Sequence, residues 1–249
     1  MGPKMTSIKR LMSLTTSCAS PCALLATALF CSAASAEDAA AAAAAPSNTI
    51  RVGMYFVRYN SSANDLNGPF TPPGLNLHVN RVNTSYAAYL RRLTDHWDVE
   101  LAAGVPPTTH TLGRGPSMLG SVPFNGQEVA TVKWFSPTVL LEYSFFAEQA
   151  PLRPFVGAGV NYTHFYERST TAAGQAITGG PTATYLSDSV GPAVTAGLKY
   201  SFTRNIHAVV SYSFAQVSSD FDAVTAGISR RTTVHFNPAT AVASVGYSF

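Results

Sequence analysis

Residues 190–202 read VGPAVTAGLKYSF, a stretch in which apolar residues alternate with small, polar or charged ones. Because successive side chains of a β-strand point to opposite faces, this alternation predicts a strand with one apolar face and one face of small and polar side chains. The same pattern recurs about eight times after residue 49, most clearly in residues 135–145, 206–214 and 240–249. The sequence therefore predicts an all-β protein built from long amphipathic strands.

The composition argues against several other classes of protein. Charged residues make up 12% of the 249 residues and hydrophobic residues 46%, whereas a soluble domain has roughly 25% charged residues. A chain so rich in apolar and aromatic residues has enough surface to bury, which argues against disorder. Lys and Arg are few and scattered, which argues against nucleic-acid binding. A helical membrane protein is disfavoured because no uninterrupted apolar run approaches ~20 residues.

The length of the strands favours a membrane barrel over a soluble sandwich, whose short strands recur roughly every 8–12 residues. In a transmembrane barrel the apolar face meets lipid, the polar face lines the interior, and closure of the sheet satisfies every backbone hydrogen bond. Aromatic residues gather near the predicted strand ends, as in the interfacial girdles of such barrels, and include Trp97, Tyr143, Tyr200 and Phe202. We expect an eight-stranded antiparallel transmembrane β-barrel.

The predicted connections alternate in length. Short ones lie at residues 94–95, 147–151 and 203–205, and long ones rich in Gly, Pro, Ser, Thr and Asn lie at residues 60–77, 107–129, 168–185 and 219–230. Short periplasmic turns and long extracellular loops are typical of outer-membrane barrels. An even number of strands then brings both ends of the barrel sheet to the periplasmic side.

The first short turn predicts a strand register. With residues 94–95 as a two-residue turn, Arg91 lies opposite Asp98 on the inward face, and Glu100 shares that face. Opposite charges on neighbouring strands favour an ion pair, so we expect one inside the lumen between Arg91 and the carboxylates of Asp98 and Glu100. Leu90 then faces lipid.

The N-terminal residues resemble a secretory signal. Three basic residues fall within residues 4–10, an apolar core covers residues 23–30, and residues 34–36 read ASA, as a cleavage site does. We expect residues 1–36 to be a signal peptide, residues 37–49 an Ala-rich periplasmic lead-in, and residues 50–249 the barrel.

Cleavage after Ala36 would change the charge and the cysteine content. All three cysteines precede residue 36, so the mature chain would have no disulfide and no thiolate site. The leader also contains three of the 16 basic residues, which leaves 13 basic residues against 13 acidic ones.

Several segments resemble, in order, those of the OmpW family of outer-membrane barrels. Residues 153–163, RPFVGAGVNYT, are similar to the family's fifth strand. The other similar segments are residues 83–85, 94–101, 136–143, 188–197 and 236–249. The resemblance covers about residues 50–249, whereas the long loops match no family pattern.

The resemblance implies a monomeric eight-stranded barrel in the bacterial outer membrane, in contact with outer-membrane lipid and lipopolysaccharide. It implies a narrow, largely apolar interior that gives small hydrophobic molecules passive passage, with release sideways into the bilayer. An eight-stranded lumen is nearly filled by side chains, which excludes a wide water channel. A structural or receptor barrel that binds phage or bacteriocins through its outer loops is the alternative.

Four large apolar residues are expected to face the interior or its rim: Trp134, Leu140, Phe155 and Phe165. A porin with a polar lumen has no need of them, whereas a path for hydrophobic solutes does. Plain packing of the lumen explains each of them equally well.

Three prolines and the last aromatic residues have further predicted roles. Pro137, Pro192 and Pro238 each remove a hydrogen-bond donor from a predicted strand, which predicts either a bulge or a lateral opening. Tyr247 and Phe249 resemble the C-terminal signal that the barrel assembly machinery reads, and they are also typical girdle residues.

An enzyme that modifies lipid A is the least favoured alternative. His207 and Ser211 share the predicted inward face, but four residues of strand separate them by about 13 Å, too far for a direct proton relay. No H-x-H or H-E-x-x-H pattern occurs. We expect neither catalysis nor a metal or cofactor.

Overall fold

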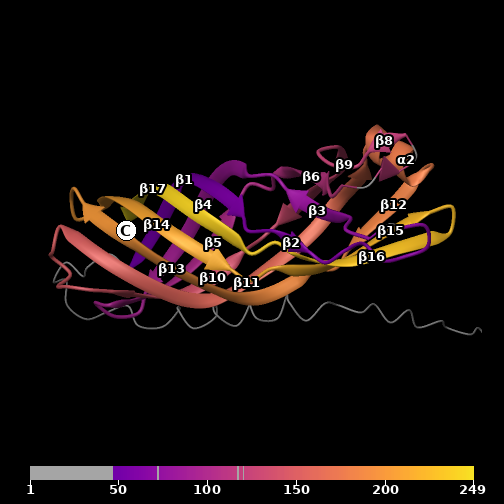
Figure 1. Cartoon of the computed structure of the whole chain (residues 1–249). Helices are drawn as coiled ribbons and strands as arrows, with labels where there is room; N and C mark the ends of the chain where they lie inside the picture. Colours follow the sequence, from indigo (N-terminus) through magenta and orange to yellow (C-terminus); the bar gives the residue numbers. More distant parts are fainter. Residues whose placement is uncertain (1–46, 72, 117, 120) are drawn as a thin grey trace, which may run out of the picture. The chain divides into compact units, whose positions relative to one another are not determined.

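The computed structural model describes residues 47–249 except 72, 117 and 120, so the predicted signal peptide and nearly all of the lead-in lie outside the described residues. Eight strands form the barrel: β1 (Asn48–Tyr59), β4 (Val82–Arg92), β5 (Trp97–Gly104), β10 (Thr138–Ser144), β11 (Leu152–Thr170), β13 (Ser189–Ser201), β14 (Ile206–Ala215) and β17 (Pro238–Ser248). Each pairs with its neighbour in the order β10-β5-β4-β1-β17-β14-β13-β11, and pairing of β10 with β11 closes the ring. This confirms the predicted antiparallel barrel (Figure 1).

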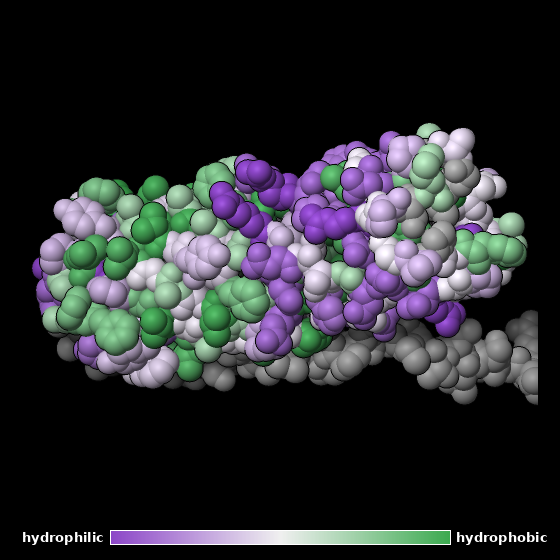
Figure 2. Space-filling model, viewed as in Figure 1, coloured by the Kyte–Doolittle hydropathy of each residue, from purple (hydrophilic) through white to green (hydrophobic). Residues whose placement is uncertain are grey.

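The outward face of the barrel strands is apolar. Val52, Leu198 and Val245 expose 57%, 43% and 54% of their surface, although large aliphatic side chains are normally buried in water-soluble proteins. Figure 2 shows hydrophobic residues spread over the part of the surface formed by the barrel strands. Hydrophilic residues gather over the part formed by the long connections. Such a surface is suited to the hydrocarbon of a bilayer. No helix among the described residues is long and apolar enough to cross a membrane.

Two periplasmic turns share one hydrogen-bonding pattern. In the first, Thr94 Oγ1 accepts hydrogen bonds from the backbone N–H of His96 and Trp97, at 3.3 and 3.1 Å. In the other, Thr203 Oγ1 accepts from the N–H of Asn205 and Ile206, at 3.2 and 2.9 Å. The threonine hydroxyl thus satisfies amides that the strands leave without a partner.

Removing either hydroxyl should destabilise the barrel modestly. We expect Thr94→Ala and Thr203→Ala each to lower the free energy of unfolding by about 1 kcal/mol, since two amides lose an acceptor near water. Urea unfolding in lipid vesicles, followed by tryptophan fluorescence, measures the change. Thr94→Ser and Thr203→Ser keep the hydroxyl and should match the unmodified protein. Alanine variants as stable as the serine variants would contradict this role.

The predicted register at the first turn is wrong by one residue. The turn covers residues 93–96, and β4 pairs with β5 so that Leu90 lies opposite Glu100 and Arg92 opposite Asp98. A shift of one residue turns every side chain of a strand to its other face. Leu90 is therefore inside the barrel with 3% of its surface exposed, and Arg91 is outside.

The predicted lumen ion pair is corrected accordingly. Arg91 is exposed and donates hydrogen bonds to Asn48 Oδ1 and Ser47 Oγ, at 2.7 and 3.2 Å. Glu100 faces the lumen as predicted, but its partner is Arg51 of β1. Asp98 is half-buried and, in the described part of the chain, forms no ion pair.

The long extracellular connections contain much regular structure instead of forming open loops. One sheet extends β11 through β9 (Glu128–Phe135), β6 (Thr108–Arg114) and β3 (Asn76–Val79), and a second joins β12 (Thr182–Leu186), β15 (Ser218–Thr225), β16 (Ile228–His235) and β2 (Ser62–Ala63). Helix α2 (Ala172–Thr178) and the hairpin of β7 (Met118–Leu119) with β8 (Val122–Pro123) complete this region (Figure 1). The outward faces of these strands are polar, as at Asp220 and Arg231, so their composition resembles that of loops.

These extracellular elements enclose an apolar core that continues the interior of the barrel. Its buried members come from both sheets and from α2: Leu75, Leu77, Val79, Phe124, Val132, Phe165, Ile177, Val217, Val234 and Phe236. The strands therefore bury apolar side chains inward at their extracellular end too.

Candidate functional site

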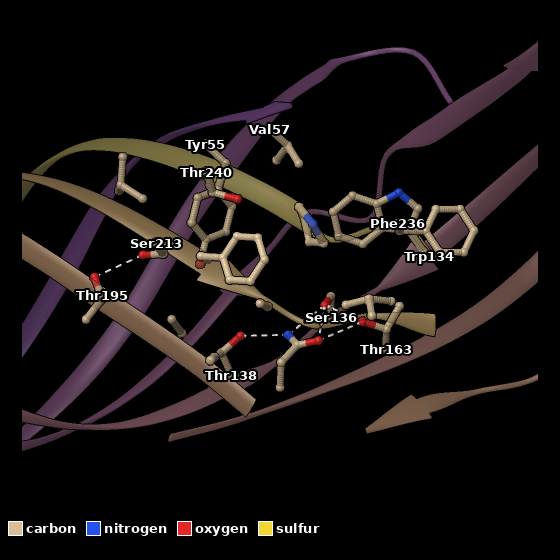
Figure 3. Close-up of a pocket in the computed structure, with 18 of the residues that line it drawn as sticks. Tyr55, Val57, Trp134, Ser136, Thr138, Thr163, Thr195, Ser213, Phe236 and Thr240 are labelled. Carbon is tan, nitrogen blue, oxygen red and sulfur yellow. Dashed lines mark hydrogen bonds between the residues drawn. The ribbon is translucent and has the colours of Figure 1, made fainter. Parts of the chain in front are cut away.

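A cavity of about 930 Å³, partly open to solvent, lies within the barrel. Residues from all eight barrel strands and from extracellular strands line it, and Figure 3 shows the side chains of several of them around the space. Of the four apolar residues predicted to face the interior, Trp134, Leu140 and Phe165 line this cavity. We call it the barrel cavity.

Aromatic rings surround its extracellular end. The ring of Tyr59 lies edge-on to those of Trp134 and Phe236, with centroids 6.5 and 6.3 Å apart. Phe236 is also 5.2 Å from Phe165. Figure 3 shows Trp134 and Phe236 close together at this end. Edge-to-face rings of this kind form a rigid apolar wall.

Several polar side chains of the barrel cavity bond to one another. Asn161 Nδ2 donates to Ser136 Oγ and Thr138 Oγ1, each at 2.8 Å, and Thr163 Oγ1 donates to Asn161 Oδ1 at 2.9 Å. Across the cavity, Ser213 Oγ donates to Thr195 Oγ1 at 2.9 Å (Figure 3). Since these groups satisfy each other, an apolar solute does not have to leave them unpaired. These hydroxyl and amide groups therefore do not oppose the binding of an apolar molecule in the barrel cavity.

A buried ion-pair cluster closes the periplasmic end of the cavity. Arg51 Nη1 lies 2.6 Å from Glu100 Oε2, and Arg51 Nη2 lies 3.4 Å from Glu142 Oε2. The three residues expose 4% of their surface or less. Tyr86 donates its hydroxyl to Glu100 Oε1 at 3.1 Å. We call these four residues the charged floor.

Phe155, the fourth predicted apolar residue, packs against this floor and does not line the barrel cavity. Its ring lies 5.4 Å from the Arg51 guanidinium and is 2% exposed. Gly197 makes room for it, because a Cβ there would lie 2.6 Å from Phe155 Cζ. A cation over an aromatic face is a favourable contact in a dry interior.

A second buried arginine seals the barrel below the charged floor. Arg153 is 2% exposed, and its Nη2 donates to the backbone oxygen of Asp95 at 2.6 Å, while its Nε donates to that of Phe145 at 3.2 Å. It therefore ties two periplasmic turns together across the end of the barrel. Sequence analysis missed both Arg51 and Arg153, although each stands on a strand whose alternation would have placed it inward.

Two smaller cavities continue the barrel cavity outward. The outer one has about 620 Å³ and is lined by β15, β16, α2 and neighbouring loops, and the one between them has about 390 Å³. The middle cavity shares Val79 and Phe236 with the barrel cavity. It shares Leu77, Ala130, Thr184 and Phe221 with the outer cavity. The shared lining residues place the three spaces in a row, with largely apolar walls, from the extracellular region to the charged floor.

Backbone pairing is interrupted beside the barrel cavity. Pairing of β5 with β10 ends at Ala102–Thr138, and pairing of β6 with β9 begins at Thr108–Lys133. Within the described ranges, no backbone hydrogen bond joins residues 103–107 to residues 134–137. We call these two segments the ladder break. Trp134 and Ser136 belong both to this break and to the cavity lining.

Prolines explain the ladder break. Pro106, Pro107 and Pro137 all lie within it, and proline has no N–H to donate to a ladder. At the other two predicted prolines the pairing continues: Gln216 N donates to the oxygen of Pro192 at 3.0 Å, and Pro238 opens β17 opposite Tyr59. The Pro106-Pro107 pair is visible in the sequence and could have been added to the predicted set.

The family of this protein follows from a comparison with known sequences. The sequence model of the OmpW family matches residues 46–249. The chain belongs to the OmpW family. Together with relatives named outer membrane protein W, this membership places it in the bacterial outer membrane.

Two curated relatives and one solved structure illustrate the range of the OmpW-family likeness. The Dibenzothiophene metabolism operon protein PahQ of Pseudomonas aeruginosa is 37% identical over 122 residues, which are 48% of this chain and 53% of PahQ, so the chain spans about half the length of this relative. Outer membrane protein W of Vibrio cholerae is 28% identical over 63% of this chain and 69% of that protein. The crystal structure of the outer membrane protein OprG from Pseudomonas aeruginosa shares the fold, with a TM-score of 0.73 and 22% identity over 82% of this chain and 96% of OprG.

The C-terminal aromatic pair of this OmpW-family barrel lies on its lipid-facing surface. Tyr247 and Phe249 are 55% and 53% exposed, and their rings stack with centroids 6.3 Å apart. Both therefore stand at the periplasmic rim, where girdle aromatics are expected. Their reading by the assembly machinery stays a prediction.

Proposed function

We propose that the protein gives small hydrophobic molecules passive passage across the outer leaflet of the outer membrane, with sideways release into the bilayer. Solutes enter the outer cavity, move inward to the barrel cavity and leave through the ladder break. The observation that carries this proposal is that the barrel cavity is closed by the charged floor on its periplasmic side yet borders unpaired backbone on its lateral side.

The chemistry of the walls supports an apolar solute. Glu100, at the floor, is the one charged residue among the residues that line the barrel cavity. A hydrated ion entering there would lose its water without gaining partners, whereas an apolar molecule gains by leaving water.

The similarity to PahQ supports the same class of solute. That relative is named for a dibenzothiophene metabolism operon, and dibenzothiophene is a flat, uncharged aromatic molecule. Aromatic walls such as those of Tyr59, Trp134 and Phe236 favour flat rings by stacking and edge contacts. We therefore take uncharged aromatic compounds as the first probes.

Uptake of dibenzothiophene by cells tests the proposal. Cells that lack their own OmpW-family protein are compared with and without this chain, and entry is followed as the initial rate of cell-associated dibenzothiophene. We expect faster entry with the protein. A hydrophilic solute of similar mass, such as a hexose, should enter at the same rate in both strains. Equal dibenzothiophene entry would overturn the proposal.

Restoring backbone donors at the ladder break tests the exit route. The triple variant Pro106→Ala, Pro107→Ala, Pro137→Ala can form ladder bonds there, and one net bond of about 1 kcal/mol would lower the open population and the uptake rate about fivefold. Pro192→Ala, at an exposed position where pairing already continues, is the matched control and should leave uptake unchanged. Unchanged uptake in the triple variant would mean that solutes leave elsewhere.

A further inference from the structure

The outer cavity contains an arginine for which the described part of the chain offers no hydrogen-bond or ion-pair partner. Arg230 lies on β16, on the inward face that it shares with the buried residues Thr232 and Val234. It lines the outer cavity, and its Nη1 atom is buried without a hydrogen-bond partner among the described residues. Every other described residue that lines this cavity is uncharged.

The backbone around Arg230 holds it in this position. Residues 67 and 231 exchange backbone hydrogen bonds, with Asn67 N donating to Arg231 O at 2.9 Å and Arg231 N to Asn67 O at 2.8 Å. Gly68 then lies so close that a Cβ on it would be 3.1 Å from Arg230 Cγ. The stem of the arginine is thus covered by the segment that follows β2, and its head group is directed into the cavity wall.

The acidic residues nearby already have other partners. Asp222 accepts from Ser229 Oγ at 2.6 Å and from Arg231 Nε at 3.1 Å, on the outer face of the sheet. Asp65 Oδ2 accepts from Gly74 N at 3.0 Å. Arg230 therefore differs from its neighbour Arg231, whose side chain is 75% exposed and paired.

An unpaired guanidinium beside an apolar cavity calls for an anionic partner. Arg230 is half-buried, and burial of its Nη1 atom without a partner is unfavourable. A carboxylate matches the planar fork of a guanidinium with two parallel hydrogen bonds. The rest of the cavity offers aliphatic and aromatic walls from Leu66, Phe124, Ile177 and Phe221. A ligand that fits both features has an apolar body and one carboxylate.

We propose that Arg230 forms a head-group subsite for apolar monocarboxylates at the extracellular entrance. This inference rests on the proposed function, because the outer cavity is taken as the entrance of the solute path. Aromatic and aliphatic acids would bind here through the carboxylate, while their uncharged counterparts would use the apolar walls alone.

Equilibrium binding of 1-naphthoate and of its methyl ester tests the subsite. The full chain is placed in phospholipid nanodiscs, empty nanodiscs give the partition blank, and naphthalene fluorescence reports bound probe. We expect Arg230→Gln to weaken naphthoate binding about tenfold, as loss of a charged hydrogen-bonded pair does, and to leave the ester unchanged. Arg231→Gln, the adjacent outward arginine, should bind both probes as the unmodified protein does.

Each other outcome has a definite meaning. Equal naphthoate binding by the unmodified protein and Arg230→Gln overturns the subsite, and so does equal weakening of acid and ester, which would indicate a packing role. Absence of naphthoate binding overturns it as well. Dibenzothiophene uptake is scored separately in cells, so the proposed function can stand when the subsite fails. If naphthoate binds but dibenzothiophene uptake does not depend on the protein, the anion subsite at Arg230 stands and the proposed passage function is overturned.

Discussion

Replacing Arg51 with methionine should destabilise the barrel by about 3–5 kcal/mol, because Glu100 and Glu142 would remain buried without their shared cation. Methionine replaces the aliphatic stem of the arginine but not the guanidinium above Phe155, so we expect a smaller part of the loss to come from that space and the larger part from the unpaired carboxylates. Urea unfolding in lipid vesicles, followed by tryptophan fluorescence and by the mobility of unheated samples on gels, measures the change.

Two variants separate this effect from a general loss of arginine. Arg91→Met removes an exposed arginine from the adjacent strand and should cost less than about 1 kcal/mol. The triple variant Arg51→Met, Glu100→Gln, Glu142→Gln removes all three charges and should recover most of the lost stability. If Arg51→Met were as stable as Arg91→Met, the charged floor would not be a stabilising ion-pair cluster.

The substitution Trp134→Asp should lower dibenzothiophene uptake about tenfold or more, which corresponds to a barrier increase of about 1.4 kcal/mol. Trp134 lies where the barrel cavity meets the ladder break, so every solute on the proposed path passes it. A carboxylate at this point holds water that an apolar solute would have to displace. The initial uptake rate, normalised to the amount of folded protein in the outer membrane, gives the result.

Trp134→Phe is the matched control for this substitution. It keeps an aromatic ring facing Tyr59 and should retain most of the uptake. Folded protein is counted by the gel mobility of unheated samples, since a folded barrel migrates differently from an unfolded chain. Undiminished uptake by Trp134→Asp would show that the solute path avoids the barrel cavity.

The fold was predictable because two-residue periodicity survives wherever one face of a strand meets lipid. Residues 190–202 and 206–214 alternate as expected, with Val194 and Val210 outward and Thr195 and Val209 inward. The extracellular strands were not predicted, because their outward faces meet water and lose the apolar signal. β15 and β16 cover almost the whole of the predicted loop 219–230.

The register at the first turn failed for a local reason. A dipeptide cannot reveal how many residues a turn contains. Here the closing hydrogen bond runs from Leu93 N to Trp97 O at 2.8 Å, so three residues, 94–96, lie within the turn instead of two, and the Thr94 hydroxyl stabilises it. The one additional residue in the turn directs the side chains of β4 to the faces opposite to those predicted. The partner of Glu100 is therefore Arg51 and not Arg91. The lumen charge was therefore expected from the sequence, but its cation was assigned to the wrong strand.

The sequence predicted which apolar residues face the interior, but not the polar and charged contacts of the site. Trp134, Leu140 and Phe165 meet around one cavity because strand alternation fixes their direction. The hydrogen-bonded group around Asn161 joins the consecutive barrel strands β10 and β11, and the floor around Arg51 joins residues 49 and 91 positions apart in the sequence. Alternation within one strand reveals neither set of contacts. The expected contacts with lipopolysaccharide and with the assembly machinery, and the expected monomeric state, stay predictions.

The charged floor has a consequence for the cell that makes this protein. With Arg51, Glu100 and Glu142 filling the barrel cross-section, salts and water-soluble antibiotics find no continuous aqueous route to the periplasm through it. A planar bilayer containing many copies should therefore stay electrically silent. Under the proposed function, the number of copies in the membrane can rise with the supply of hydrophobic solutes while the envelope stays closed to hydrophilic ones.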